Sequence, residues 1–397
     1  PSRGLGVVYN SQERTCVTEA ELNQMKQILY DGMKAGAFGI SADKNMEDRP
    51  EDGSFLPSHV ASREEFMAMA EVMGQFGVGH IGWTIGMGHD EEELDSQRKL
   101  LADMTRVSGR PLHLDGGNAA GSEWFQQTRD EGLPIVLQEV CMEVEAEFTF
   151  GEYNLFDYMP NWVDPLVGTP EERAAKLRRP EVREAMKADI DKGVDGLSAA
   201  VLTNERTDWT RFRVLQVANE RNYKYEGMTV AQMADMDNKH PVDAMMDLAL
   251  DENLETEFSH VVAFGDESVV EKSISNPHSH ISVSDGGAHT RYLTVSQWPI
   301  YFLSHWIRDK ELMTLEQAHV KMSQYPAWFA DFKDRGTLRP GAYADVVVFD
   351  LDRIRDRATY TDPHQYSEGV VHVLVNGELT LREEEMTGSM SGEVLRR

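Results

Sequence analysis

Hydrophobic and polar positions along the chain follow two periodicities, one typical of helices and one typical of strands. The stretch TEAELNQMKQILYDGMKAG begins with a threonine suited to cap a helix, repeats apolar residues three and four positions apart, and stops at Gly36. This pattern predicts a helix over residues 18–36. The run AFGIS follows directly and predicts a strand. Because helical and strand-like stretches keep alternating, the sequence predicts a β/α repeat architecture.

Four further short runs, apolar or β-branched, have the composition of strands. They are VGHIGWTIG, RPLHLDGG, LPIVLQEV and HISVSD, at residues 78–86, 110–117, 133–140 and 280–285. The first three are apolar on both sides of their alternation, as expected for parallel strands covered by helices. The sequence therefore predicts the α/β class, with a β/α (TIM-like) barrel as the main unit.

Two regions break this alternation. Residues 148–225 are rich in aromatic residues, proline and charge, which suggests an insertion lying over one end of the barrel. From about residue 334 onward, Pro-Gly and Asn-Gly turns separate β-branched runs, which predicts β-hairpins over residues 334–354 and 369–388. We therefore expect the barrel over residues 1–333 and a small β domain over residues 334–397.

Charge and cysteine content narrow the class of function. The 397-residue chain carries 39 Lys and Arg against 68 Asp and Glu, a formal net charge of −29, which repels phosphate backbones and anionic lipid. We expect no nucleic-acid partner and no membrane, because no apolar run approaches the ~20 residues that span a bilayer. Two cysteines, Cys16 and Cys141, are too few for a disulfide framework, and a reducing, cytoplasmic location fits them.

Polar groups gather where the predicted strands end, which is where an α/β barrel places its reacting groups. Neutral imidazole and carboxylate suit zinc or another divalent metal, and a metal-bound water suits hydrolysis. The candidates are His80, His89, His113, Asp115, Gln138, Glu139, Asp285 and His289.

Each candidate also has a structural alternative. A histidine near a strand end, such as His80 or His89, is more often a hydrogen-bonded structural residue. Asp285 differs, because an aspartate between an apolar run and Gly-Gly is costly in a core but well placed to hold a metal or take a proton. His278 and His280 are expected to precede this strand and to be structural, while His289 could reach the same pocket.

The C-terminal sequence carries a family resemblance. SDGGAHT at residues 284–290, the later stretch TLEQAHVKMSQYPAWFADFKDRGTLRPGAYADVVVFDLDRI and the end VLVNGELTLREEEMTG resemble the amidohydrolase superfamily, in its D-aminoacylase branch. The resemblance implies a metal-dependent β/α barrel with a small β-sandwich, in which Asp285 binds metal and handles the proton. It also implies that Arg291 binds a substrate carboxylate, which bidentate pairing makes chemically sensible.

The resemblance does not include the first part of a family member. Members of the family start with strands that include a His-x-His metal motif, and this chain has its one His-x-His at residues 278–280. We therefore expect residues 1–333 to hold the barrel strands after the third, and residues 334–397 to hold the C-terminal half of the β-sandwich. A second chain of roughly 150 residues, either a second gene product or the other half of a cleaved precursor, would supply the rest within a higher oligomer. The alternative is that this sequence is one part of a longer chain.

These expectations combine into one functional hypothesis and one alternative. The first is a large subunit or fragment of a metal-dependent hydrolase that cleaves an amide or cyclic amide in a small molecule, such as an N-acyl amino acid. Its catalytic residues would be Asp285 and His289, its metal ligands Asp285, His113 and His80, and its substrate-binding residues Arg291 and Gln138. The alternative is a metal-free scaffold or ligand-binding subunit of a hetero-oligomer.

Overall fold

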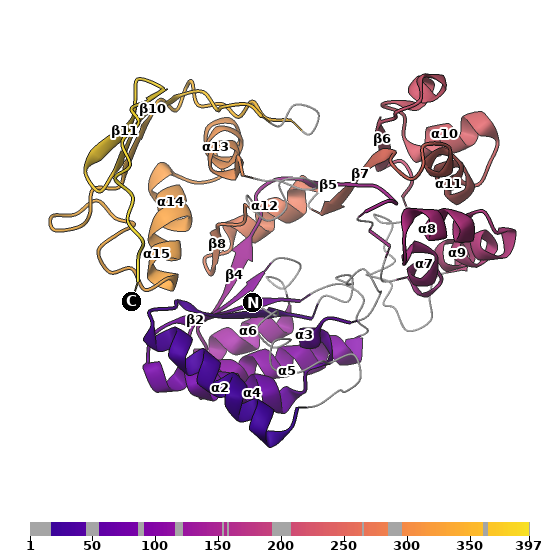
Figure 1. The fold of residues 1–397 in the computed structure, drawn as a ribbon. Helices are drawn as coiled ribbons and strands as arrows, with labels where there is room; N and C mark the ends of the chain where they lie inside the picture. Colours follow the sequence, from indigo (N-terminus) through magenta and orange to yellow (C-terminus); the bar gives the residue numbers. More distant parts are fainter. Residues whose placement is uncertain are drawn as a thin grey trace.

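A computed structural model describes most of the chain and contains three β-sheets. Figure 1 shows one parallel sheet with helices on one side, a lobe of short helices at the right, and a C-terminal sheet at the left. The described residues are 17–44, 55–85, 91–115, 122–152, 155–156, 159–192, 208–263, 266–284, 296–359 and 364–396.

The parallel sheet contains all five strands that the apolar runs predict. Its order is β1-β2-β3-β4-β8, with every neighbouring pair parallel. The strands are β1 (Gly39–Asp43), β2 (His80–Thr84), β3 (Leu112–Asp115), β4 (Ile135–Glu139) and β8 (Ser279–Ile281). The α/β class is therefore confirmed. Within the described residues the sheet is open, so the closed barrel and the partner strands stay predictions.

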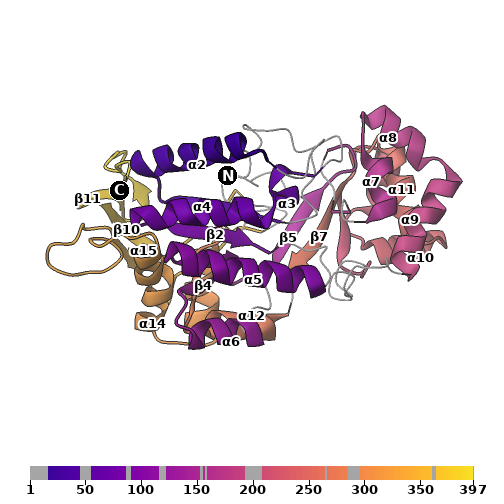
Figure 2. The same cartoon turned by 90° about the horizontal axis from the view of Figure 1, so that it is seen from below.

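Helices cover one face of this sheet, as Figure 2 shows for α2, α4 and α5. Thr18 and Ser62 cap α2 and α4, and in each case a glutamate three residues later completes a capping box, as the first helical pattern predicts. The helices are α2 (Glu19–Lys34), α4 (Arg63–Phe76), α5 (Glu91–Ser108) and α6 (Glu123–Asp130), with the short α3 (Pro57–Val60) after β1.

Strand alternation gives the parallel sheet two unlike faces. Alternate strand residues pack into a buried core with the helices, among them Ile81, Trp83, Leu112, Leu114 and Ile135. The residues between them point to the opposite face, because successive side chains of a strand alternate in direction. We call this opposite side the inner face.

A second, antiparallel sheet belongs to the lobe. Its order is β5-β7-β6, made of β5 (Val144–Phe148), β7 (Glu257–Ala263) and β6 (Phe212–Gln216). One face packs into a core rich in aromatic side chains. The core also receives α7 (Pro160–Val163), α8 (Pro170–Leu177), α9 (Pro180–Lys192), α10 (Val230–Asp237) and α11 (Pro241–Asp251). The predicted insertion thus contributes to a core of its own.

The C-terminal part combines short helices with an antiparallel sheet of order β12-β11-β10-β9. The helices are α12 (Glu267–Ser275), α13 (Trp298–Tyr301), η4 (Phe302–Asp309), α14 (Leu315–His319), η5 (Val320–Gln324) and α15 (Tyr325–Phe329). The strands are β9 (Val346–Phe349), β10 (Val370–Val375), β11 (Glu378–Arg382) and β12 (Glu385–Met386). The domain division at residues 333 and 334 stays a prediction.

Of the two predicted C-terminal hairpins, one is confirmed and one is wrong. β10 and β11 form a hairpin across Asn376 and Gly377, both of which have the positive φ that such a turn needs. Residues 334–354, all described, hold the single strand β9, which pairs with β10 instead of with a neighbour of its own. The Pro-Gly turn therefore precedes a strand and does not join two.

None of the described helices combines the length and the apolar character needed to cross a bilayer.

Candidate functional site

Strand register arranges the inner face into rows. One row runs through Ser41, Gly82, His113 and Val136, and the next, nearer the carboxyl ends of the strands, through Asp43, Thr84, Asp115, Gln138 and His280. Parallel β/α folds place their chemistry at the carboxyl ends of the strands, because the following loops converge there. The second row therefore marks the expected site.

A cavity of about 140 Å³ opens on these rows. It is lined by Ser41, Ala42, Asp43, Gly82, Trp83, Thr84, His113 and Gln138. Two predicted site residues, His113 and Gln138, thus lie together on neighbouring strands, although their roles stay predictions. The lining offers hydroxyl, amide, imidazole and carboxylate groups, which is the polar set that recognises a small polar molecule.

Three imidazoles lie in sequence along the inner face, against one phenyl ring. The ring centroids of His80 and His113 are 5.7 Å apart, and those of His113 and His280 are 6.4 Å apart. Phe329, which ends α15, lies 4.4 Å from the ring of His80 and stacks on His113 at 4.9 Å. An aromatic side chain therefore packs against the histidines that the sequence predicted as metal ligands.

Burial keeps two of these imidazoles neutral. Desolvation, with a smaller contribution from His80, lowers the pKa of His113 to about 4. Desolvation, followed by His113 and Lys321, lowers the pKa of His280 to about 3. At neutral pH both rings are uncharged, so each offers one N–H donor and one nitrogen acceptor.

Gly82 makes room for His113. A Cβ atom at position 82 would lie 2.6 Å from Nε2 of His113, closer than any real contact of this kind. Gly82 is thus needed because a side chain of the neighbouring strand β3 packs against it. Any side chain at this position would push the imidazole out of its place in the cavity wall.

A hydrogen-bond chain links Gln138 to β8. Its Nε2 donates to Oγ of Ser282 over 2.8 Å, and the same hydroxyl lies 3.0 Å from Nδ1 of His280. The expectation that His280 precedes the strand is wrong, because β8 comprises Ser279–Ile281 and includes it. β-Pairing of Gln138 with His280 places this histidine in the row of site residues. The sequence signal was present, since HSHISV can be read as a strand from its first histidine.

A buried lysine supports β8 through three hydrogen bonds. Nζ of Lys321 in η5 donates to the carbonyl oxygens of Asn276 and Ser279, over 2.6 and 3.0 Å, and to Oγ of Ser279 over 3.1 Å. Burial lowers the pKa of Lys321 to about 8, and the charge of the fully buried Glu139 acts in the opposite direction. Glu139, a candidate in the sequence, thus lies beside a structural lysine.

Sequence reasoning missed a residue pair at the end of β1. Asp43 lines the cavity, and its Oδ1 lies 3.1 Å from Nε2 of His59 in α3. The segment between them has no strand or helix pattern that would place His59 beside the sheet. The one available signal was the position of Asp43 directly after the run GISA.

The described residues do not by themselves fit a metal site. In the part of the chain that the structure describes, no three His, Cys, Asp or Glu side chains are grouped so that they could hold a metal ion. His80 and His113 have suitable donor atoms, but Phe329 packs against both rings. Asp285, the third predicted ligand, lies outside the described residues, as do His89, His289 and Arg291.

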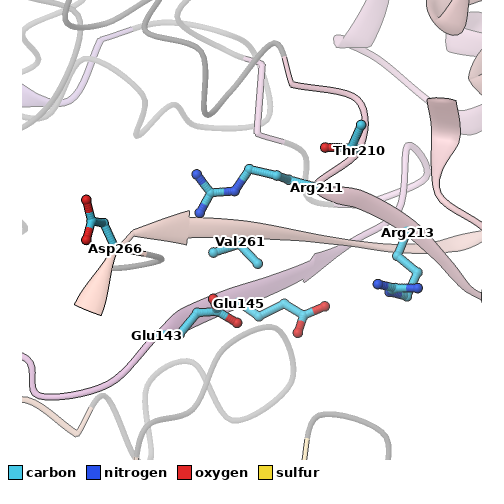
Figure 3. A pocket seen from close by; sticks show the side chains of 7 residues that line it. All are labelled: Glu143, Glu145, Thr210, Arg211, Arg213, Val261 and Asp266. Atoms are coloured by element: carbon cyan, nitrogen blue, oxygen red, sulfur yellow. The ribbon is translucent and has the colours of Figure 1, made fainter. Parts of the chain in front are cut away.

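A larger cavity, of about 470 Å³, lies on the charged face of the β5-β7-β6 sheet (Figure 3). Figure 3 shows Arg211 extending over the sheet, with Val261 on the central strand and Glu145 below it. Opposite charges across neighbouring strands commonly stabilise an exposed sheet face. The smaller cavity, which lies at the carboxyl ends of the parallel strands, is therefore the candidate site.

Comparisons with known proteins identify the family of the chain. The family model described as "Amidohydrolase family" matches residues 12–381. A stretch of 75 residues is 52% identical to the N-acyl-D-glutamate deacylase of Alcaligenes xylosoxydans xylosoxydans, covering 19% of this chain and 15% of that protein. The chain thus spans only a small part of the length of this relative.

Two solved structures have a similar fold. One is a D-aminoacylase, with a TM-score of 0.64 and 20% identity, over 100% of this chain and 70% of that chain. The other is the N-acyl-D-glutamate deacylase of Bordetella bronchiseptica, solved with zinc and a phosphonate inhibitor. Its TM-score is 0.59 at 21% identity, over 92% of this chain and 64% of that one. At these identities the similarity shows the fold.

Proposed function

The chain belongs to the amidohydrolase family, and from this premise we propose that it takes part in hydrolysing the amide C–N bond of a small N-acyl amino acid. The family match covers most of the chain. The short stretch shared with an N-acyl-D-glutamate deacylase favours an acylated amino acid over other amides. Selectivity for the D form and for an acidic side chain is part of the proposal.

One observation carries this proposal. A cavity at the carboxyl ends of parallel strands is lined by a carboxylate, two hydroxyls, a carboxamide and a neutral imidazole. An amide group presents one donor, its N–H, and one acceptor, its C=O, and this lining offers partners for both. The volume of about 140 Å³ is enough for the amide and a small acyl group, so the rest of the substrate would extend outward.

In this proposal, side chains of the chain transfer the protons and bind the substrate. The oxygen of a water molecule bonds to the amide carbon, the C–N bond breaks, and the nitrogen leaves with a proton. Asp285, which follows β8 in the sequence, takes the proton from the water and passes it to the leaving nitrogen, and His289, four residues later in the sequence, is a second proton-transfer group. Arg291 holds the substrate carboxylate through its two parallel N–H groups, and Gln138 binds the substrate inside the cavity.

A divalent metal, zinc first, is a separate part of the proposal. A metal would polarise the carbonyl and lower the pKa of water. The zinc in the similar Bordetella structure supports this idea, whereas the surroundings of His80 and His113 do not. The proton steps above are therefore assigned to side chains alone. A second chain that completes the ligand set stays a prediction.

The test is hydrolysis of N-acetyl-D-glutamate, N-acetyl-D-alanine and their L forms, with metal content measured on the same sample. We expect turnover of at least one D substrate. Asp285→Asn should lower turnover by at least about 100-fold, as expected for a lost general acid or base. Asp191→Asn serves as the matched control, because this exposed aspartate lies in α9 of the lobe and contacts His240. Equal rates in both variants would contradict the role of Asp285.

The second candidate function is a ligand-binding subunit without catalysis. The packing of Phe329 against the predicted metal ligands favours it. It predicts saturable binding of the N-acetyl amino acids with no release of acetate, and no bound metal in the purified complex.

A further inference from the structure

Asp43 and His59 form a partly buried pair at the rim of the cavity. Asp43 is the last residue of β1 and lines the cavity, and its side chain is 25% exposed. The side chain of His59 is 0% exposed and lies behind it, with Nε2 3.1 Å from Oδ1 of Asp43. The carboxylate thus faces the cavity and the imidazole faces the interior.

This geometry fixes which atom donates. An ionised carboxylate can only accept hydrogen bonds, so the imidazole must carry its proton on Nε2 to make this contact. Nδ1 of His59 is buried and has no hydrogen-bond partner among the described residues. Phe55 packs edge-on against the ring, with centroids 6.3 Å apart. His59 is therefore a positioning residue, and among the described residues the one polar contact of its side chain is with Asp43.

The side chain of Asp43 restricts what the cavity can hold. Of the described residues that line the cavity, Asp43 is the one with an acidic side chain. An ionised carboxylate accepts hydrogen bonds and donates none, so it pairs with a donor group of the ligand and not with a ligand carboxylate. An amide fits better, because its N–H can donate to Asp43 while the hydroxyls of Ser41 and Thr84 can donate to its carbonyl oxygen.

We propose that Asp43, positioned by His59, accepts the N–H of the scissile amide and thereby excludes tertiary amides, which have no N–H. The inference rests on the proposed function, because it takes an N-acyl amino acid as the ligand. It adds a recognition residue on the strand farthest in the sheet order from β8, which leads to Asp285. The carboxylate of the ligand would then point out of the cavity.

A binding measurement tests this inference independently of turnover. The probes are N-acetyl-D-glutamate and N-acetyl-N-methyl-D-glutamate, which differ in the amide N–H. Titration calorimetry on protein that carries Asp285→Asn, so that hydrolysis of the first probe is slowed during the titration, gives the ratio of their Kd values. With Asp43 and His59 native, this protein should bind the N–H form roughly 10- to 100-fold more tightly, the range of a hydrogen bond to a charged group. Asp43→Asn should bring the ratio close to one, since the Asn carbonyl would face His59 and its NH₂ would face the ligand.

His59 is tested by a pair of variants. His59→Gln keeps a donor near the Nε2 position and should keep most of the preference, whereas His59→Phe removes the donor and should lose it. Asp191→Asn again serves as the control, because the same kind of contact, 3.2 Å from His240, lies in the lobe. Its ratio should equal that of the native protein.

Two results would overturn the inference. One is a native protein that binds both probes equally or binds neither. The other is an Asp43→Asn protein that keeps the native ratio, because the preference would then come from the bulk of the methyl group. A preference that depends on Asp43, in a protein that releases no acetate, would support the inference while contradicting the proposed hydrolysis.

Discussion

The parallel sheet and the lobe sheet are built alike but use their polar faces differently. Each packs one face into an apolar core of aliphatic and aromatic side chains, and the core of the lobe includes five buried phenylalanines. The polar face of the lobe sheet carries Glu145 and Glu147 on β5 and Arg213 on β6. The described lining of the cavity on the parallel sheet instead combines small or neutral polar groups with one carboxylate, Asp43.

This difference suggests that the polar face of the lobe sheet serves solvation and that the inner face of the parallel sheet serves ligand recognition. Charges distributed over an exposed sheet are hydrated, and exposed pairs contribute little stability. Neutral donors and acceptors beside a single charge leave specific positions for a ligand to fill. The distribution of polar groups, more than the size of a cavity, therefore indicates where this molecule binds its ligand.

The largest expected effect tests whether the two cores are independent. Phe258 in β7 is fully buried and stacks on Phe148, with centroids 5.6 Å apart. Phe258→Ala should lower the free energy of unfolding of the lobe by about 3–5 kcal/mol. Hydrogen exchange should then accelerate in β5, β6 and β7 while the amides of β2, β3 and β4 stay protected. Uniform acceleration would show that the two regions unfold as one unit.

A smaller structural change should damage the candidate site more than the fold. Gly82→Ala places a methyl group against Nε2 of His113, which must move. We expect a cost of about 1–3 kcal/mol in the free energy of unfolding and a loss of binding for N-acetyl-D-glutamate. Gly32→Ala in α2 is the matched control, because nothing lies within 4 Å of the added atom. It should raise the free energy of unfolding by roughly 0.5–1 kcal/mol with unchanged binding.

Repulsion between glutamates on the charged face of the lobe sheet should make the free energy of unfolding depend on pH. Burial, with Glu257 and Glu145, raises the pKa of Glu147 to about 7. The folded-state pKa exceeds the unfolded one, so this group's contribution to stability is complete below pH 4.5 and is lost as pH rises through 7.

Glu147→Gln should therefore raise the free energy of unfolding at pH 8, by about 1 kcal/mol after solvent screening of this half-exposed group, and leave it nearly unchanged at pH 4. Thermal unfolding at both pH values measures the effect. An equal change at both would assign the effect to packing rather than to charge.

The sequence predicted what depends on local patterns. The runs around Ile81, Leu114 and Leu137 became buried parallel strands, because alternating apolar residues specify which face is covered. The sequence also identified Gln138 and His113 as candidate site residues, because each lies in a predicted strand. Both line the cavity.

What depends on long-range packing could not be predicted. The contact of His59 with Asp43 depends on how the chain returns after β1, and no spacing rule encodes that path. Phe329, more than two hundred residues from His80, looked like an ordinary apolar position of a helix, yet it packs against the inner face. The pairing of β5 with β7 likewise joins strands separated by the helices of the lobe.

The central claim is that an N-acyl amino acid binds at the carboxyl ends of the parallel strands. A crystal structure with N-acetyl-D-glutamate tests it most directly. The account predicts the amide group inside the cavity lined by Asp43, Thr84, His113 and Gln138, with its N–H toward Asp43. A ligand bound instead between Arg211 and Glu145 on the lobe sheet, with the inner face left unchanged, would contradict it.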